Sequence, residues 1–373
     1  MPKYDDLQLL KSDEYFISIA KQGPHSFMML GVLKDGSPQL LARVGKTNDI
    51  DPSADSAIDM TLKALGQGTL ARISDEGISR KEGIKADISY QAYSINYNQV
   101  KEYLGLIAAV EKKQLAESNI QQGIINKYRK VYKWEDANEV ILDDAAIRAY
   151  VPIESSTADE VTFAHKKLSD CTFLTNNELD AQKQTIATKA QQIHVFNTCR
   201  NTALNMVEAI LGFMTKVSQH FFISPRYQTQ LIAGQPDKNS FYILPSPPNV
   251  FKDKLSDRQF KILNKLYQRM EEIPLANANT PQTRAKFDAL KATYKDIAGT
   301  NNLSANELLS KIQEHEEKNK AALFEKRSPN LLSKGLSLSS TTEKLFTKMK
   351  KELDQVVSKG EESQDKDKPI KSP

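Results

Sequence analysis

The sequence predicts an α+β domain over residues 1–250, a helical extension over 251–360 and a disordered polar tail over 361–373. Residues 12–250 mix strand-like apolar runs with helix-period patterns. The run Pro245-Ser246-Pro247-Pro248 interrupts this mixture, and only helix patterns follow it. The last residues are almost wholly polar, a composition that cannot bury enough apolar surface to fold.

Residues 12–50 have the pattern of a strand meander. Strand-like runs cover 15–20, 25–32 and 39–44, and turn residues separate them. His25 therefore opens a strand directly after a turn. Further extended segments are expected at 84–95, 147–152, 160–163 and 241–244.

Helix start signals predict most of the helices. Asn96 or Asn98 begins an amphipathic pattern that continues to residue 110, and residues 54–65 have the pattern of a short helix. In the extension, Ser256 and Ser304 have capping-box spacing, and Thr280 precedes a proline at the first helical position. A last helix is expected over about 342–360. The polar stretch around Tyr128, Tyr132 and Trp134 and residues 168–186 are expected to be connections.

Composition excludes several classes of protein. The chain has 51 basic and 47 acidic residues, a balance that does not favour nucleic acid as a partner. We expect no transmembrane segment, since no apolar run approaches the ~18 residues needed to span a bilayer, and no signal peptide. Two cysteines do not form a disulfide framework and suit a reducing compartment.

Cys199 is the candidate nucleophile. The apolar spacing of Ala203, Met206, Ile210 and Val217 predicts an amphipathic helix. Asn197 is the expected N-cap, which places Cys199 in the first turn. The positive end of the helix and the neighbouring Arg200 would both favour a thiolate. The alternative is that Cys199 is a small buried hydrophobe that packs the helix start.

A thiol nucleophile needs a base, and the best placed of the five histidines is His25. His194, just before the cysteine helix, is the other candidate. Gln39, on the strand after the His25 strand, is the expected partner of the second ring nitrogen. We expect no metal, because His165 and Cys171 have no partner pair, and no cofactor, because no glycine pattern of a phosphate-binding loop occurs. Lys344, Lys348, Lys350 and Lys351 are read as a solvated helix face, with weak membrane-surface contact as the lesser alternative.

Two segments resemble circularly permuted papain-like cysteine proteins. The run Gly23-Pro24-His25-Ser26-Phe27-Met28-Met29-Leu30-Gly31 is similar to the histidine strand of that superfamily, and Asn197-Thr198-Cys199 is similar to its cysteine helix start. The histidine precedes the cysteine, as in the permuted order. The run Leu40 to Lys46, the segment 93–106 and Phe241-Tyr242-Ile243-Leu244-Pro245 also resemble type IV secreted effectors of Legionella. Pro24 departs from the family, where glycine is more usual at this position, and so does the long insertion between the motifs.

The resemblance implies a permuted papain-like domain with a Cys199–His25 pair. It also implies an effector that is secreted by the type IV route into the host cytoplasm. The expected activity is a thiol-dependent hydrolase or acyltransferase of the peptidase or deconjugase type, with oxyanion donors at the helix start near Asn197 and Arg200. Its substrate would be a host protein, a peptide or an acyl chain. The alternative is a non-catalytic effector that binds a host protein through its C-terminal helices.

Overall fold

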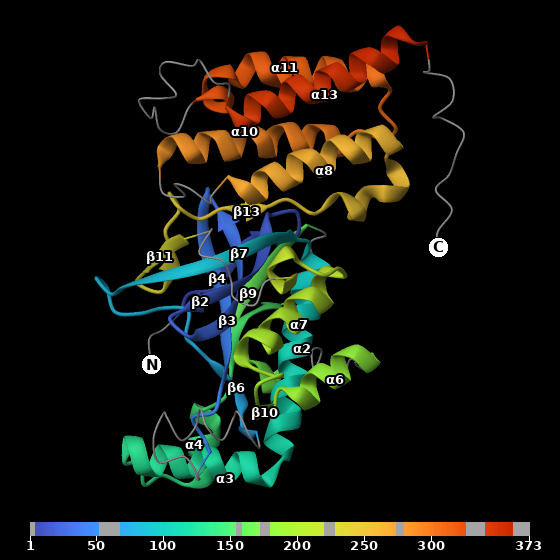
Figure 1. Cartoon of the computed structure of the whole chain (residues 1–373). Coiled ribbons are helices and arrows are strands. Elements are labelled where there is room, and N and C mark those ends of the chain that lie inside the picture. The colour runs from blue at the N-terminus through green and yellow to red at the C-terminus, as the bar shows by residue number, and fades with distance from the viewer. Residues whose placement is uncertain are drawn as a thin grey trace. The chain divides into compact units, whose positions relative to one another are not determined.

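The computed structural model describes residues 4–51, 68–153, 159–171, 180–219, 228–273, 280–325 and 340–360 (Figure 1). The chain divides into two compact units, one of Met1–Ser224 with Thr229–Lys238 and the other of Pro225–Gln228 with Asn239–Pro373. The second unit thus begins before residue 251, where we expected the extension. The predicted helix at 54–65 and the predicted tail at 361–373 lie outside the described residues.

The first unit has the predicted α+β class, with antiparallel sheets. Its main sheet has the strand order β12-β11-β7-β2-β3-β4-β6. These strands are β2 (Tyr15–Gln22), β3 (His25–Lys34), β4 (Ser37–Thr47), β6 (Arg72–Asp75), β7 (Lys85–Ile95), β11 (Gln228–Ile232) and β12 (Gln235–Pro236). The predicted meander is confirmed as β2, β3 and β4, which pair in sequence through Gln22↔His25 and Lys34↔Ser37.

Two smaller sheets complete the strands of this unit. The order β1-β9-β8 joins β1 (Leu7–Leu10), β9 (Glu160–Lys167) and β8 (Arg148–Ile153), and β10 (Gln192–Ile193) pairs with β5 (Thr69–Leu70). The strand pair predicted at 147–152 and 160–163 is confirmed by the antiparallel register of β8 with β9.

In the first unit, α7 packs against β2, β3 and β4 of the main sheet (Figure 1). The helices of the first unit are α2 (Tyr97–Ala116), α3 (Ser118–Lys127), α4 (Asn138–Asp144), α6 (Ala181–Lys189) and α7 (Cys199–Leu211), with one turn of π-helix, η1 (Tyr128–Tyr132), and 3-10 turns η2 (Leu168–Asp170) and η3 (Lys216–Gln219). The predicted start of α2 is confirmed, because Asn96 and Gln99 form a reciprocal capping box.

The expected connection around Tyr128 is wrong. The stretch folds as α3, η1 and α4, and buries its own small apolar cluster, made of Ile50, Ile120, Ile124, Ile125, Tyr128 and Ile141. Trp134 packs against this cluster and lies edge-on to Tyr128. These helices are short, so the sequence shows too few turns of helical period to reveal them.

Three other boundaries differ from the expected ones. The expected connection at 168–186 includes the first part of α6, which runs from Ala181 to Lys189 and has Asp180 as its N-cap. The Cys199 helix ends at Leu211 rather than near Val217, because Gly212 takes a left-handed conformation with φ 72°. The strand expected at 241–244 shortens to β13 (Ile243–Leu244).

The second unit is helical after β13 and the 3-10 segment η4 (Pro248–Lys254), and its helices begin close to the predicted caps. They are α8 (Asp257–Glu272), α10 (Pro281–Ala298), α11 (Ala305–Phe324) and α13 (Thr341–Ser358), with N-caps Ser256, Thr280, Ser304 and Ser340. Buried Gln259 of α8 binds the end of α10 and the connection between α10 and α11. Its amide donates to the carbonyls of Ile297 (2.7 Å) and Thr300 (2.6 Å), and its oxygen accepts from the Leu303 amide (3.1 Å).

Among the described residues, no helix combines the length and the apolar character needed to cross a bilayer.

The outer edge of β6 is closed by a side chain of α2. The buried Gln114 accepts from the Ile73 amide at 3.0 Å and donates to the Ile73 carbonyl at 3.0 Å. Gln114 thus satisfies the two backbone groups that a neighbouring strand would otherwise bind. This contact fixes the strand that leads directly to residue 76.

Replacing Gln114 with Met should therefore destabilise the first unit, because both backbone groups of Ile73 lose their partner while staying buried. We expect a loss of about 2–3 kcal/mol in the free energy of unfolding, measured by urea denaturation with Trp134 fluorescence. The matched control is Gln122→Met, which removes only an exposed contact to Asn126. Equal, small effects of the two substitutions would contradict this role of Gln114.

Candidate active site

The structure brings His25 and Cys199 together. His25 is the first residue of β3, Cys199 is the first residue of α7, and α7 packs on β3. Their side chains form a hydrogen bond, and the sulfur also accepts from the backbone amide of Ser26, the next residue of β3. The side chain of Cys199 is partly exposed, whereas Cys171 is buried. Cys199 therefore combines access to solvent with a basic partner, which are the two requirements of a thiol nucleophile.

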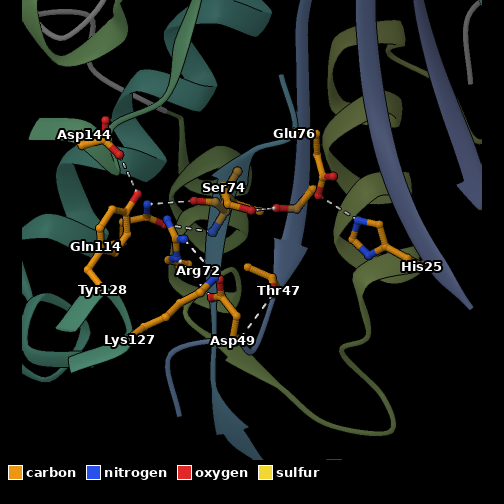
Figure 2. Close-up of polar contacts among 12 residues, drawn as sticks. His25, Thr47, Asp49, Arg72, Ser74, Glu76, Gln114, Lys127, Tyr128 and Asp144 are labelled. Atoms are coloured by element: carbon orange, nitrogen blue, oxygen red, sulfur yellow. Dashed lines mark hydrogen bonds and ion pairs between the residues drawn. The ribbon is translucent and has the colours of Figure 1, made fainter. Parts of the chain in front are cut away.

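The second partner of the imidazole is Glu76. The Nε2 atom of His25 lies 2.9 Å from Oε1 of Glu76. Figure 2 shows the two side chains pointing toward each other. Glu76 directly follows β6, and its amide donates to the carbonyl of Arg43 on β4 at 2.9 Å. Because Nε2 is engaged by the carboxylate, Nδ1 is the ring nitrogen left for the thiol. A carboxylate on one side of an imidazole and a thiol on the other is the order that a nucleophile, a base and an orienting group require.

A glycine makes room for the His25–Glu76 contact. Gly45 of β4 lies opposite Phe27 of β3 and opposite Ser74 of β6. A Cβ atom at this position would lie 2.5 Å from Oε1 of Glu76 and 2.7 Å from Nε2 of His25. Both distances are shorter than real Cβ contacts, so a side chain at position 45 would force the Glu76 carboxylate or the His25 ring to move.

The electrostatics of the site favour a thiolate–imidazolium pair. The hydrogen bond to Cys199, followed by the one to Glu76, raises the pKa of His25 to about 9. Burial opposes ionisation of Cys199, but the hydrogen bonds from His25 and from the amide of Ser26 outweigh it, and the pKa of the thiol falls below its ordinary value. Cys171 shows the opposite behaviour, since burial raises its pKa.

Glu76 is ionised in this arrangement. Its burial acts against the charge, but the hydrogen bond to His25 and the nearby charges of His25, Arg43 and Arg80 hold the pKa of the carboxyl below its usual range. Arg43 is itself buried, with its guanidinium carbon 4.4 Å from the centre of the Phe27 ring. Glu76 therefore supplies a fixed negative charge to the imidazolium.

Asn197 lies at the predicted position but has a different role. The N-cap of α7 is Thr198, whose hydroxyl accepts from the Asn201 amide at 3.3 Å, so the assignment of Asn197 as N-cap was wrong. The amide group of Asn197 points inward and donates to the carbonyls of Lys189 (2.6 Å) and Gln192 (2.8 Å). With both amide hydrogens engaged, Asn197 braces the turn before α7 and cannot donate to an oxyanion.

Arg200 acts on the Cys199 sulfur through its backbone amide and not through its charge. Its guanidinium donates to the carbonyl of Val217 at 2.6 Å, and its backbone amide is the group that reaches the Cys199 sulfur. The expectation that the Arg200 cation would stabilise the thiolate is therefore replaced by a contribution from the helix-start amide.

Gln39 is not the orienting residue. It lies opposite Val32, at the other end of β3 from His25, and its place is taken by Glu76. His194, the second candidate base, lies in the turn before α7, where its Nδ1 accepts from the Phe196 amide at 3.3 Å and its carbonyl accepts from the Asn197 amide at 2.8 Å.

Glu76 was missed because residues 48–90 show little periodicity. The one signal that could have drawn attention to this place is Gly45. A glycine inside a strand of apolar and β-branched residues often marks a close approach of other groups, but it does not say which groups approach.

The described residues hold no group of three or more side chains that could bind a metal ion. His165 packs with Tyr4 and Tyr150, at ring-centroid distances of 4.0 Å and 5.3 Å, and Cys171 donates to the carbonyl of Lys167. Comparisons of the chain with models of protein families, with curated proteins and with solved structures find no match. The site therefore has to be interpreted from its own geometry.

Gly45→Ala should break the contact between His25 and Glu76, because the new methyl group occupies the space between them. We expect the pKa of His25, measured by NMR, to fall from about 9 towards its ordinary value. Gly299→Ala, at a helix end of the second unit, is the control. An unchanged pKa of His25 in the Gly45 variant would contradict the geometry described.

Glu76→Gln keeps the shape of the side chain and removes its charge. The imidazolium then loses its anionic partner, so the pKa of His25 should fall and alkylation of Cys199 at neutral pH should slow by roughly threefold to tenfold. The control is Glu82→Gln, at an exposed position. The contrary result is an equal alkylation rate in both variants.

Proposed function

We propose that this chain is a thiol-dependent hydrolase or acyltransferase with a circularly permuted papain-like domain. Cys199 is the nucleophile, His25 is its general base and acid, and Glu76 orients and charges the imidazole. The observation that carries the proposal is the placement of the His25 ring between the Cys199 thiol and the Glu76 carboxylate, which is 2.9 Å from Nε2. A structural cysteine needs neither partner.

In the first step, the Cys199 thiolate attacks the carbonyl carbon of the substrate. The carbonyl π electrons move to oxygen, where amides at the start of α7 would stabilise the oxyanion. The intermediate collapses to a thioester, and the imidazolium of His25 gives its proton to the departing amine or alcohol. His25 is then neutral, and Glu76 holds its ring in place.

In the second step, neutral His25 removes a proton from water or from an acceptor hydroxyl or amine. The resulting nucleophile attacks the thioester, and the Cys199 thiolate leaves. Water as the acceptor gives hydrolysis, and an amine or alcohol gives acyl transfer. Both reactions use the same groups, so the chemistry that we propose is acyl transfer through a thioester in either case.

Several features support the papain-like type. The histidine opens a strand of an antiparallel sheet, the cysteine begins a helix packed on that strand, and the histidine comes first in the chain. The resemblance to type IV secreted effectors suggests a host-cell peptide, protein conjugate or acyl chain as substrate.

The most direct test is the alkylation of the two cysteines by iodoacetamide at pH 7, read by mass spectrometry. Because the pKa of Cys199 is lowered and that of Cys171 is raised, Cys199 should react at least about tenfold faster. In His25→Ala, the midpoint of the Cys199 profile should rise towards about 8.5, the value of a free thiol. Equally slow labelling of both cysteines in the unaltered protein would refute the proposed function.

The pH dependence of Cys199 reactivity follows from the lowered pKa of Cys199 and the raised pKa of His25. The ion pair exists above the lowered pKa of Cys199 and below the raised pKa of His25, which is about 9. The reactivity of Cys199 should therefore rise at a lower pH than the reactivity of a free thiol does.

A further inference from the structure

A buried lysine lies beneath the first turn of the cysteine helix. Lys46 of β4 is 2% exposed. Its Nζ atom donates to the carbonyl of Lys189 at 2.9 Å, to the carbonyl of Asn197 at 3.2 Å and to the hydroxyl of Thr202 at 3.1 Å. Asn197 and Thr202 stand on either side of Cys199 in the sequence, so the ammonium group lies against the segment that presents the thiol.

These contacts are those of a charged lysine. An ammonium group has three hydrogens and no acceptor, and each of the three finds an oxygen here. Burying the charge is nevertheless costly, and an apolar residue of similar volume is often at least as stabilising. A function for the charge would explain why a lysine occupies this position.

The polar network around Lys46 joins three elements. The carbonyl of Lys189, at the end of α6, accepts from both Lys46 and the amide of Asn197. Thr202, in the first turns of α7, also donates to Oδ1 of Asn197 at 3.4 Å. Lys46 thereby connects the sheet to the end of α6 and to the start of α7.

Among the residues that the structure describes, few other charges act on the thiol. On β3 the titratable neighbour of Cys199 is His25, which leads to Glu76, and Arg43 of β4 lies towards Glu76. On α7 the guanidinium of Arg200 is engaged by Val217. Past the end of β4, Asp49 forms separate ion pairs with Arg72 and Lys127.

We infer that Lys46 is a positioning residue of the site, whose buried ammonium fixes the start of α7 and stabilises the Cys199 thiolate from below. This inference rests on the proposed function, since it assigns a second cation to the same nucleophile. Lys46 contacts no substrate and transfers no proton. It acts on Cys199 through the charge and through the backbone that it holds.

The effect is mutual. Burial lowers the pKa of Lys46 to about 7, and the negative charge of Cys199 acts in the opposite direction. A thiolate therefore helps to keep Lys46 protonated, and a protonated Lys46 favours the thiolate. The stabilisation is present at pH values where Lys46 carries its proton and is lost as the pH rises above its pKa.

The test is the pH profile of Cys199 alkylation by iodoacetamide in the full chain, with Lys46→Met and Lys46→Arg as the two variants. Methionine fills a similar volume without charge, and we expect it to raise the midpoint of the profile by about one pH unit. Arginine keeps the charge and should restore most of the shift. A thermal unfolding curve of each variant accompanies the profiles.

The outcomes separate the inference from the proposed function. A Lys46→Met protein that unfolds at a lower temperature but keeps the midpoint of the unaltered chain shows a purely structural lysine and overturns the inference. In that case a depressed midpoint in the unaltered chain still supports the Cys199–His25 pair. A midpoint near 8.5 in the unaltered chain contradicts both the inference about Lys46 and the proposed function.

His25→Ala provides a reading that does not depend on folding of the Lys46 variants. With the imidazole removed, Lys46 remains as the buried cation at the start of α7 within the described part of the chain, so the midpoint should stay below the value of a free thiol. A midpoint at or above about 8.5 in His25→Ala overturns the inference, because burial alone would then govern the thiol.

Discussion

The hydrogen bonds of one imidazole ring hold the candidate site together. His25 contacts the thiol of Cys199 and the carboxylate of Glu76, which come from the start of α7 and from the end of β6. Both partners are partly buried, and burial favours their neutral forms, so the ring is the strongest influence that keeps them ionised. The positive imidazolium lies between the negative thiolate and the negative carboxylate and stabilises both charges. The packing of α7 on β3 and the closure of β6 by Gln114 serve to keep these three groups in register.

The residues around Cys199, His25 and Glu76 make polar contacts that a purely apolar core would not need. Gly45 leaves a space where a Cβ atom would clash with both His25 and Glu76. Asn197 and Lys46 converge on the carbonyl of Lys189 and fix the turn before α7. Such buried networks stabilise a protein only when every group has its partner. Their concentration beneath Cys199, with the thiol itself partly exposed, is the distribution expected of a site that positions a nucleophile rather than of a packed helix end.

The sequence could predict those parts of the fold that depend on local patterns. The meander β2–β3–β4, the capping box at Asn96 and the caps of the second unit follow from turn residues, alternation and spacing within a few positions. Cys199 and His25 were found the same way, as a helix start and a strand start. Glu76 and Lys46 were not found, because their roles come from pairing β4 with β6 and from packing α7 on the sheet, and no local pattern records either contact. The prediction of Gln39 as the partner of His25 was wrong for the same reason. Only the pairing register of two adjacent strands shows which of their residues lie together.

The measurement that tests the central claim most directly is an NMR titration of the His25 ring nitrogens in the unaltered protein and in Cys199→Ser. We predict that the ring stays protonated up to about pH 9 in the unaltered protein and loses its proton at a clearly lower pH in the variant, since the contact to Cys199 makes the largest contribution to the shift. Titration near pH 6.5 in both proteins would show that no ion pair forms and would contradict the account.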